Sequence, residues 1–229
     1  MSSFKEKFMK ATTYWISFIC LFLVISCTTG SKKNESLPVL GNKYTEEIIV
    51  AGKKKVDTVY HQIAPFSFIN QEGLPFTQAD VRGKVYVADF FFTSCPTICP
   101  IMKTQMLRVF EKFKDEPNFL ILSHSIDPTH DTVELLKDFS VRLGVPDATT
   151  WNFLTGDQEQ IFEIGQTSYL TTAMEDKNEA GGYLHSGAFV LVDQDGHIRG
   201  VYDGTKELQV NRLMNDIPKL LATNADLDS

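Results

Sequence analysis

The chain is poor in cysteine: only four occur among its 229 residues. Cys20 and Cys27 belong to an apolar N-terminal segment, which leaves Cys95 and Cys99 for the rest of the chain. A disulfide framework normally uses several cysteine pairs spread along a small secreted chain. One close pair in a chain of this size therefore argues against such a framework and indicates thiol or metal chemistry.

A hydrophobic run long enough for a comfortable membrane span is also lacking. The uncharged stretch Tyr14–Ser26 follows three lysines and is shorter than the roughly 20 residues that cross a bilayer. This pattern predicts a secretory signal over residues 1–26. Residues 24–27 (VISC) resemble a bacterial lipobox, which predicts a lipid on Cys27 and a domain anchored in the cell envelope, outside the cytoplasm. The alternative is an uncleaved N-terminal anchor helix.

Basic residues are in the minority. Without residues 1–26 the chain carries 19 basic and 28 acidic residues, a formal charge of −9. An acidic chain with no basic stripe has no electrostatic reason to bind phosphate backbones, so nucleic acid is excluded as a partner. Residues 27–45 are polar and aperiodic, which predicts a flexible tether, and residues 46–229 have the length of one folded domain.

The folded part alternates predicted strands and helices. Short strands of an N-terminal extension are expected between residues 46 and 70, and a helix over 131–143 is expected to be capped by Asp131, with Glu134 completing a capping box. Further elements are expected at 84–92, 118–126, 151–154, 188–192 and 197–202 (strands) and at 100–114, 157–164 and 205–221 (helices). This order, with the cysteines after the first buried strand, predicts an α/β thioredoxin-like fold whose central mixed sheet is flanked by helices.

The two cysteines lie where a buried strand passes into a helix, in the run Cys95-Pro-Thr-Ile-Cys99. A thiolate at a helix N-terminus feels the positive end of the helix dipole, so we expect its pKa to fall. Thioredoxin oxidoreductases use CxxC, whereas three intervening residues put both sulfurs on one helix face. Two soft thiolates directed at one point suit Cu(I), and the same spacing still allows a disulfide.

Two thiolates leave a metal site incomplete. His185 follows the predicted loop 166–184 and immediately precedes the predicted strand 188–192, where thioredoxins place a cis-proline facing the cysteines. No proline occurs between Asp147 and Ile217, so His185 is either a third ligand or a structural residue. The other candidates are His61, His124, His130 and His197. Of these, His124 lies in a buried strand and is expected to be a satisfied core histidine.

These motifs together resemble the Sco/SenC family over about residues 60–222. The matching segments are 91–100 (FFTSCPTICP), 125–132 (SIDPTHDT), His185 and 193–196 (DQDG). The resemblance implies a thioredoxin fold that binds copper and takes part in building the copper centre of cytochrome c oxidase, as metallochaperone, thiol reductant or both.

The resemblance also assigns residues. It implies Cys95, Cys99 and His185 as copper ligands, and it places Asp127 and Asp131 near the site. Each carboxylate also has a local interpretation, because Asp127 precedes a proline in a predicted turn and Asp131 is expected to cap a helix. The two aspartates are therefore candidates for a supporting role only.

Three functions follow as hypotheses. The first is a copper-handling factor that passes its ion to the copper-centre subunit of the oxidase or to another extracytoplasmic acceptor. The second is an enzyme, a thiol–disulfide reductase in which Cys95 attacks a partner disulfide and Cys99 resolves it. The third is a sensor of copper or redox state. A peroxidase is disfavoured because Thr93 lies two residues before Cys95, where peroxiredoxin sites need three.

Overall fold

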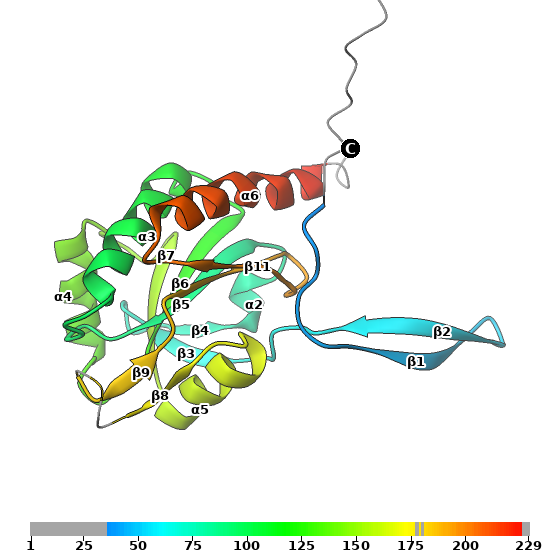
Figure 1. The fold of residues 1–229 in the computed structure, drawn as a ribbon, viewed down its shortest axis with the longest axis horizontal. Coiled ribbons are helices and arrows are strands. Elements are labelled where there is room, and N and C mark those ends of the chain that lie inside the picture. Colours follow the sequence, from blue (N-terminus) through cyan, green and yellow to red (C-terminus); the bar gives the residue numbers. More distant parts are fainter. Residues whose placement is uncertain (1–35, 177–178, 180, 226–229) are drawn as a thin grey trace, which may run out of the picture. The chain divides into compact units, whose positions relative to one another are not determined.

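A seven-stranded mixed sheet forms the centre of the protein (Figure 1). The structure is a computed structural model that describes residues 36–176, 179 and 181–225. The strand order is β11-β10-β5-β6-β7-β3-β4, with β5, β6 and β7 parallel and the outer strands antiparallel to their neighbours. The strands are β3 (Ser67–Asn70), β4 (Pro75–Thr77), β5 (Val85–Phe91), β6 (Phe119–Ser125), β7 (Trp151–Thr155), β10 (Ala188–Val192) and β11 (Ile198–Asp203).

Helices cover both faces of this sheet. On one face lie α3 (Cys99–Phe113), α4 (Val133–Leu143) and α6 (Glu207–Ala225), with α3 beside α6 in Figure 1. The opposite face is covered by α5 (Gln158–Glu163), which continues into a π-helix over Ile164–Ser168. A short helix, α2 (Gln78–Val81), follows β4. No helix in the described part of the chain is long and apolar enough to cross a bilayer.

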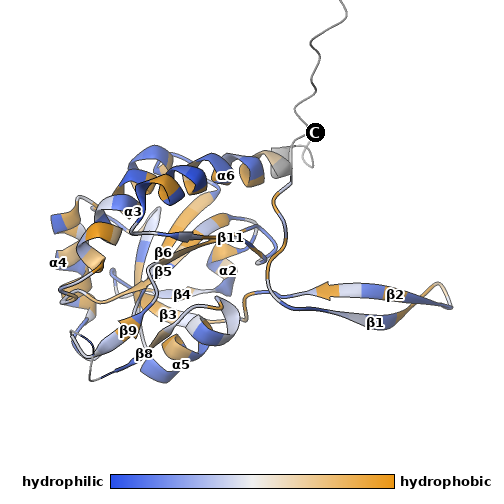
Figure 2. Cartoon of the chain, viewed as in Figure 1, coloured by the Kyte–Doolittle hydropathy of each residue, from blue (hydrophilic) through white to orange (hydrophobic). Residues whose placement is uncertain are grey.

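The central strands β5 and β6 are buried along their whole length because both of their faces are covered, and most of their residues are apolar (Figure 2). Phe91 points to the face of α4, where it packs on Phe139 and Phe153. Phe90, the next residue, points to the other face and packs on Tyr169. The predicted α/β thioredoxin-like fold, a mixed sheet flanked by helices, is confirmed, and the predicted central strands and the helix that follows the cysteines agree with β5, β6, β7 and α3 to within one residue at each end.

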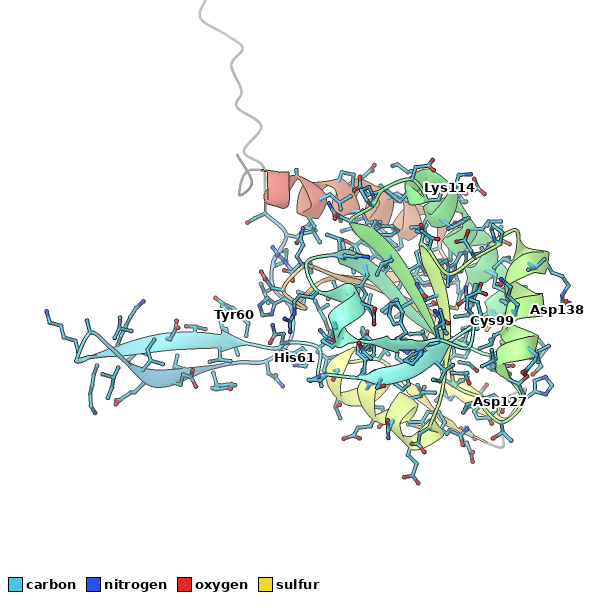
Figure 3. The ribbon with its side chains drawn as sticks, turned by 180° about the vertical axis from the view of Figure 1, so that it is seen from behind. Tyr60, His61, Cys99, Lys114, Asp127 and Asp138 are labelled. Atoms are coloured by element: carbon cyan, nitrogen blue, oxygen red, sulfur yellow. The ribbon has the colours of Figure 1, made fainter. Side chains whose placement is uncertain are left out.

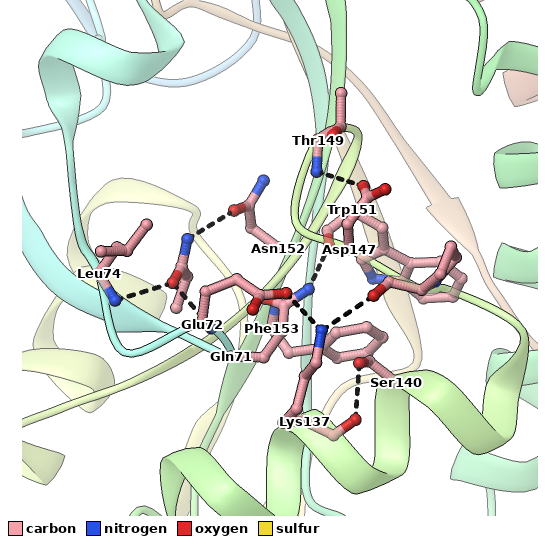
Figure 4. Close-up of polar contacts among 12 residues, drawn as sticks. Gln71, Glu72, Leu74, Lys137, Ser140, Asp147, Thr149, Trp151, Asn152 and Phe153 are labelled. Atoms are coloured by element: carbon pink, nitrogen blue, oxygen red, sulfur yellow. Dashed lines mark hydrogen bonds and ion pairs between the residues drawn. The ribbon is translucent and has the colours of Figure 1, made fainter.

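A glutamine side chain extends the hydrogen bonding of the sheet between β3 and β7 (Figure 4). Gln71 donates through Nε2 to the carbonyl oxygen of Trp151 at 2.8 Å, and its Oε1 accepts from the amide of Phe153 at 2.9 Å. The next residue, Glu72, forms an ion pair with Lys137 of α4, in which Oε1 and Nζ are 2.6 Å apart. The β3–β4 turn is thereby fixed to the rest of the sheet.

One capping prediction is wrong. Helix α4 begins at Val133 and its N-cap is Thr132, whose hydroxyl accepts from the amide of Leu135. Asp131 is instead fully buried, with its carboxylate directed towards the β5 and β6 ends. Aspartate and threonine are both good caps, so adjacent candidates cannot be separated by helix propensity alone.

The folded domain starts earlier than its composition suggests. A hairpin of β1 (Lys43–Val50) and β2 (Lys53–Tyr60) occupies part of the predicted tether 27–45. Ahead of it, Leu37 and Leu40 pack against the core, and the amide of Leu40 donates to the carbonyl of Ile198. Leu37 and Leu40 lie in an otherwise polar segment, so its composition did not indicate that they pack against the core. The predicted signal over 1–26, the lipid site Cys27 and the first part of the tether lie outside the described residues.

The predicted loop 166–184 also contains structure. It begins within the π-helix and continues into a small hairpin of β8 (Ala173–Glu175) and β9 (Tyr183–His185). These strands have three residues each, too few to give a periodic signal. His185 therefore lies on a strand rather than at the end of an irregular loop.

Candidate metal centre

Cys95 and Cys99 are free, buried thiols at the carboxyl end of β5. The chain leaves this strand in a turn, closed by the amide of Cys95 donating to the carbonyl of Phe92 at 3.3 Å. Helix α3 then begins at Cys99, with Ile98 as N-cap. Only Cys99 is helical. The expectation that both cysteines occupy the first turn of a helix is therefore wrong, and the turn at Cys95 brings the two sulfurs together.

His185 approaches both sulfurs from β9. Its Nε2 lies 3.3 Å from Sγ of Cys99 and 3.8 Å from Sγ of Cys95. The other ring nitrogen, Nδ1, is 3.3 Å from the carbonyl oxygen of Ser186. The three ligand atoms all lie within 4.8 Å of one another, and no other such group of histidine, cysteine and carboxylate side chains occurs among the described residues.

The two thiols differ in acidity. Burial tends to raise the pKa of Cys95, but hydrogen bonds from Cys99, His185 and Thr97 outweigh it and lower that pKa to about 6. Burial, and then the hydrogen bond with Cys95, raise the pKa of Cys99 far above its ordinary value. At neutral pH the pair is therefore a Cys95 thiolate beside a Cys99 thiol. The fall in the Cys95 pKa was expected, but side-chain hydrogen bonds cause it, since Cys95 precedes the helix.

Asp131 fixes the turn that carries Cys95. Its carboxylate accepts from the amide of Thr93 at 3.0 Å, from the hydroxyl of Thr93, and from the hydroxyl of Ser125 at 2.6 Å. Thr93 lies two residues before Cys95, and Ser125 is the last residue of β6. Asp131 thus connects the cysteine turn to the end of the neighbouring strand.

Asp127 fixes the strand that carries His185. The hydroxyl of Tyr183 donates to Oδ1 of Asp127 at 3.0 Å, and Nε2 of Gln158 donates to the same hydroxyl at 3.4 Å. Tyr183 lies two residues before His185, on the same side of β9, and both rings pack against Phe92. In Figure 3, Asp127 and Cys99 lie at the end of the domain opposite the β1–β2 hairpin.

Tyr183 is a residue that sequence reasoning missed. Its position two residues before a candidate ligand would have been a usable signal if β9 had been recognised. Neither Asp127 nor Asp131 joins the cluster of ligand atoms. Their side chains act on the segments that carry the cysteines and the histidine.

The other four histidines lie outside the cluster. The ring of His61 bonds the backbone carbonyl of Ser168, and the ring of His197 bonds the backbone carbonyl of His61. His130 is exposed. His124 is buried among aromatic rings, as expected, but neither of its ring nitrogens has a hydrogen-bond partner among the residues that the structure describes. Burial lowers its pKa to about 3, so it is neutral at physiological pH.

A buried carboxyl group lies on β5, the strand that leads to the cysteine turn. Asp89 of β5 accepts from the hydroxyl of Ser123, which in turn accepts from the indole N–H of Trp151 at 2.9 Å. Burial raises the pKa of Asp89 to about 7, although the hydrogen bond from Ser123 opposes this shift. The group is therefore partly protonated near neutral pH.

Comparison with known families identifies this arrangement. The family model described as SCO1/SenC matches residues 55–222. The chain belongs to the SCO1/SenC family. The resemblance drawn from the cysteine, aspartate and histidine motifs is thus confirmed at the level of the family.

Solved SCO1/SenC structures have the same fold. A SCO1/SenC family lipoprotein from Bacillus anthracis str. Ames is 33% identical, with a TM-score of 0.64 over 70% of this chain and 95% of that one. BsSco, described as a member of the Sco family of cytochrome c oxidase assembly proteins, is 31% identical, with a TM-score of 0.62 over 70% and 93%. ScoI of Arabidopsis thaliana, solved with copper bound, is similar in fold, with 24% identity and a TM-score of 0.57 over 70% and 98%.

Proposed function

We propose that this SCO1/SenC protein binds one copper ion through Cys95, Cys99 and His185 and passes it to an acceptor protein. The observation that carries the proposal is the convergence of two sulfurs and one imidazole nitrogen within 4.8 Å. A metal about 2.0–2.3 Å from each of three ligands separates them by roughly 3.5–4 Å, close to the spacing found here. Soft thiolates with imidazole suit copper.

The acceptor in this proposal is the copper-centre subunit of cytochrome c oxidase. Support comes from the similarity to BsSco, which belongs to a family of oxidase assembly proteins. A hollow of about 390 Å³ lies beside the site, lined in part by Ile98, Gly187 and Val201. An acceptor segment seated there would lie next to the cysteine turn, where ligand exchange has to occur.

A second candidate is a thiol–disulfide reductase, favoured by the difference in acidity between the two thiols. The Cys95 thiolate attacks a partner disulfide, forms a mixed disulfide and releases one partner thiolate. Cys99 then loses its proton and attacks Cys95, releasing the second partner thiol and leaving a Cys95–Cys99 disulfide. The partner is reduced by two electrons, and the pair is oxidised by the same number.

Copper titration tests the three-ligand site. Residues 28–229, fully reduced, would be titrated anaerobically with Cu(I), alongside Cys95→Ser, His185→Ala and, as a control, His130→Ala. We expect one tightly bound ion, with losses in the first two variants beyond the roughly 10–100-fold typical of outer-shell partners. His130→Ala should bind as the unsubstituted chain does. Equal affinity with and without His185 would contradict the site and leave the reductase as the better account.

We also propose that Cys27 carries a lipid that holds the domain at a membrane of the cell envelope, outside the cytoplasm. The lipobox-like residues 24–27 and the similarity to a Bacillus anthracis lipoprotein support this proposal. In a bacterial host, Cys27→Ser should abolish incorporation of labelled palmitate. Incorporation that persists in this variant would contradict lipidation at Cys27.

A further inference from the structure

The β1–β2 hairpin is an exposed element without a partner strand in the described part of the chain. Its two eight-residue strands form a sheet of their own, and nearly every side chain on both faces is exposed. Ala51 and Gly52, both with positive φ, form its two-residue turn. An isolated two-stranded hairpin is at best marginally stable in water, so a covering surface is expected.

The end of the hairpin combines apolar and basic residues. Residues 48–56 (IIVAGKKKV) hold three lysines and no acidic residue. Ile49 and Val56 are 76% and 64% exposed, and Val50 lies opposite Lys53 at the turn. The acidic residues of the hairpin, Glu46, Glu47 and Asp57, flank this segment, and Glu47 forms an exposed ion pair with Lys54 at 2.8 Å.

This basic end contrasts with the rest of the domain. From residue 61 onward the chain carries 13 basic and 24 acidic residues, a formal charge of −11. An anionic surface would repel most of the domain and attract the hairpin end. Exposed aliphatic side chains next to lysines are typical of segments that enter the headgroup region of a bilayer.

We propose that residues 48–56 dock onto the surface of an anionic membrane. Ile49 and Val50 enter the interface, and Lys53, Lys54 and Lys55 contact lipid phosphates. The candidate metal centre lies at the opposite end of the domain (Figure 3), so docking leaves it facing away from the bilayer.

The chain length is compatible with this arrangement. If Cys27 is the lipid site, the ten residues to Leu37 span at most about 35 Å. The eight-residue strand β1 is about 24 Å long. The hairpin end can therefore reach the bilayer that holds the anchor. The docking surface itself does not depend on the anchor, and the two can be tested separately.

Binding to vesicles tests the proposal without the anchor. Residues 28–229 should fold alone, because the solved neighbours are matched over 93–98% of their length and so consist almost wholly of this domain. The probe is vesicles of phosphatidylcholine with 30% phosphatidylglycerol, compared with phosphatidylcholine alone, by co-sedimentation at low and at high salt. We expect binding to the anionic vesicles only, weakened by salt.

Two variants separate the contributions. Replacing residues 53–55 by glutamine should weaken partitioning about 10–100-fold, since each lysine near an anionic surface contributes up to about fivefold. Ile49→Asn with Val50→Asn should weaken it about tenfold or more. Leu208→Asn, at a position 79% exposed on α6, is the apolar control and should change nothing. The charge control replaces three lysines outside the hairpin by glutamine, namely Lys84, Lys114 and Lys206, and so removes the same amount of charge.

Fluorescence gives an independent measurement. In residues 28–229 the only tryptophan is the buried Trp151, so Val50→Trp reports on the hairpin end. A blue shift on adding anionic vesicles is expected. No preference for anionic vesicles, equal binding by the hairpin variants and the controls, or a tryptophan spectrum unchanged by vesicles would each overturn the proposal.

Discussion

Removing the carboxylate of Asp131 should damage both the fold and the site. In Asp131→Ala three donors lose their acceptor: the amide and hydroxyl of the half-buried Thr93 and the hydroxyl of the buried Ser125. Each unsatisfied buried donor costs about 1–3 kcal/mol, and the two donors of the half-buried Thr93 can partly bond water instead, so the free energy of unfolding should fall by about 3–6 kcal/mol. The freed turn carries Cys95, and Cu(I) affinity should fall about 10–100-fold, as for other outer-shell partners.

Thr132→Ala is the matched control, one residue further along. It removes the observed cap of α4 and should cost about 1 kcal/mol, with Cu(I) affinity unchanged. Urea unfolding of the reduced chain and competition titration with Cu(I) measure the two effects. Asp131→Asn, which keeps one acceptor oxygen, should fall between the two and remains measurable if Asp131→Ala does not fold.

One combination of results would show that Asp131 does not hold the cysteine turn. If Asp131→Ala costs no more than Thr132→Ala and binds Cu(I) as tightly as the unsubstituted chain, Asp131 acts only at the start of the helix. The predicted role of Asp131 as a helix cap would then fit the data better than a role as acceptor for Thr93 and Ser125.

Three further outcomes are expected. Tyr183→Phe should weaken Cu(I) binding about two- to tenfold by removing the hydrogen bond to Asp127, and unchanged affinity in titration would count against that contact. Alkylation of Cys95 in the reduced, metal-free chain, followed by mass spectrometry, should have its midpoint near pH 6 while Cys99 stays unreactive; a midpoint near 9 would contradict this. Because the folded-state pKa of Asp89, about 7, exceeds its ordinary value of 3.8, protonation stabilises the fold at low pH and this contribution is lost between about pH 4 and 7. Urea unfolding should therefore show the unsubstituted chain losing on the order of 4 kcal/mol relative to Asp89→Asn over that range, and a pH-independent difference would refute the shift.

The parts of the fold that follow from periodicity were predictable. Mostly apolar runs indicated β5 and β6, and the helical stripe after the cysteines indicated α3, because burial on both faces or on one face leaves a direct pattern in the sequence. The nearness of His185 to the cysteines followed from the expected order of the strands. Nearness could be inferred because the thioredoxin arrangement brings one strand's leading segment to the cysteine turn, but a ligand and a structural residue could not be distinguished.

Other parts depend on contacts between distant residues and left no local signal. Asp131 and Thr132 are equally good caps by type, and only the donors on Thr93 and Ser125 decide which one turns inward. Tyr183 matters because Asp127 lies 56 positions away in the chain but within hydrogen-bond distance. Such pairings are set by the assembled sheet, so the family resemblance placed the two aspartates near the site without indicating their roles.

The geometry of His185 is what separates the two functional candidates. A reductase needs a reactive Cys95 and a resolving Cys99, and the difference in their pKa values provides both. It does not need an imidazole nitrogen 3.3 Å from the sulfur of the resolving thiol. A metal site needs all three groups, and binding at neutral pH must displace the proton that Cys99 otherwise holds. Return of that proton to Cys99 then favours release of the ion to an acceptor.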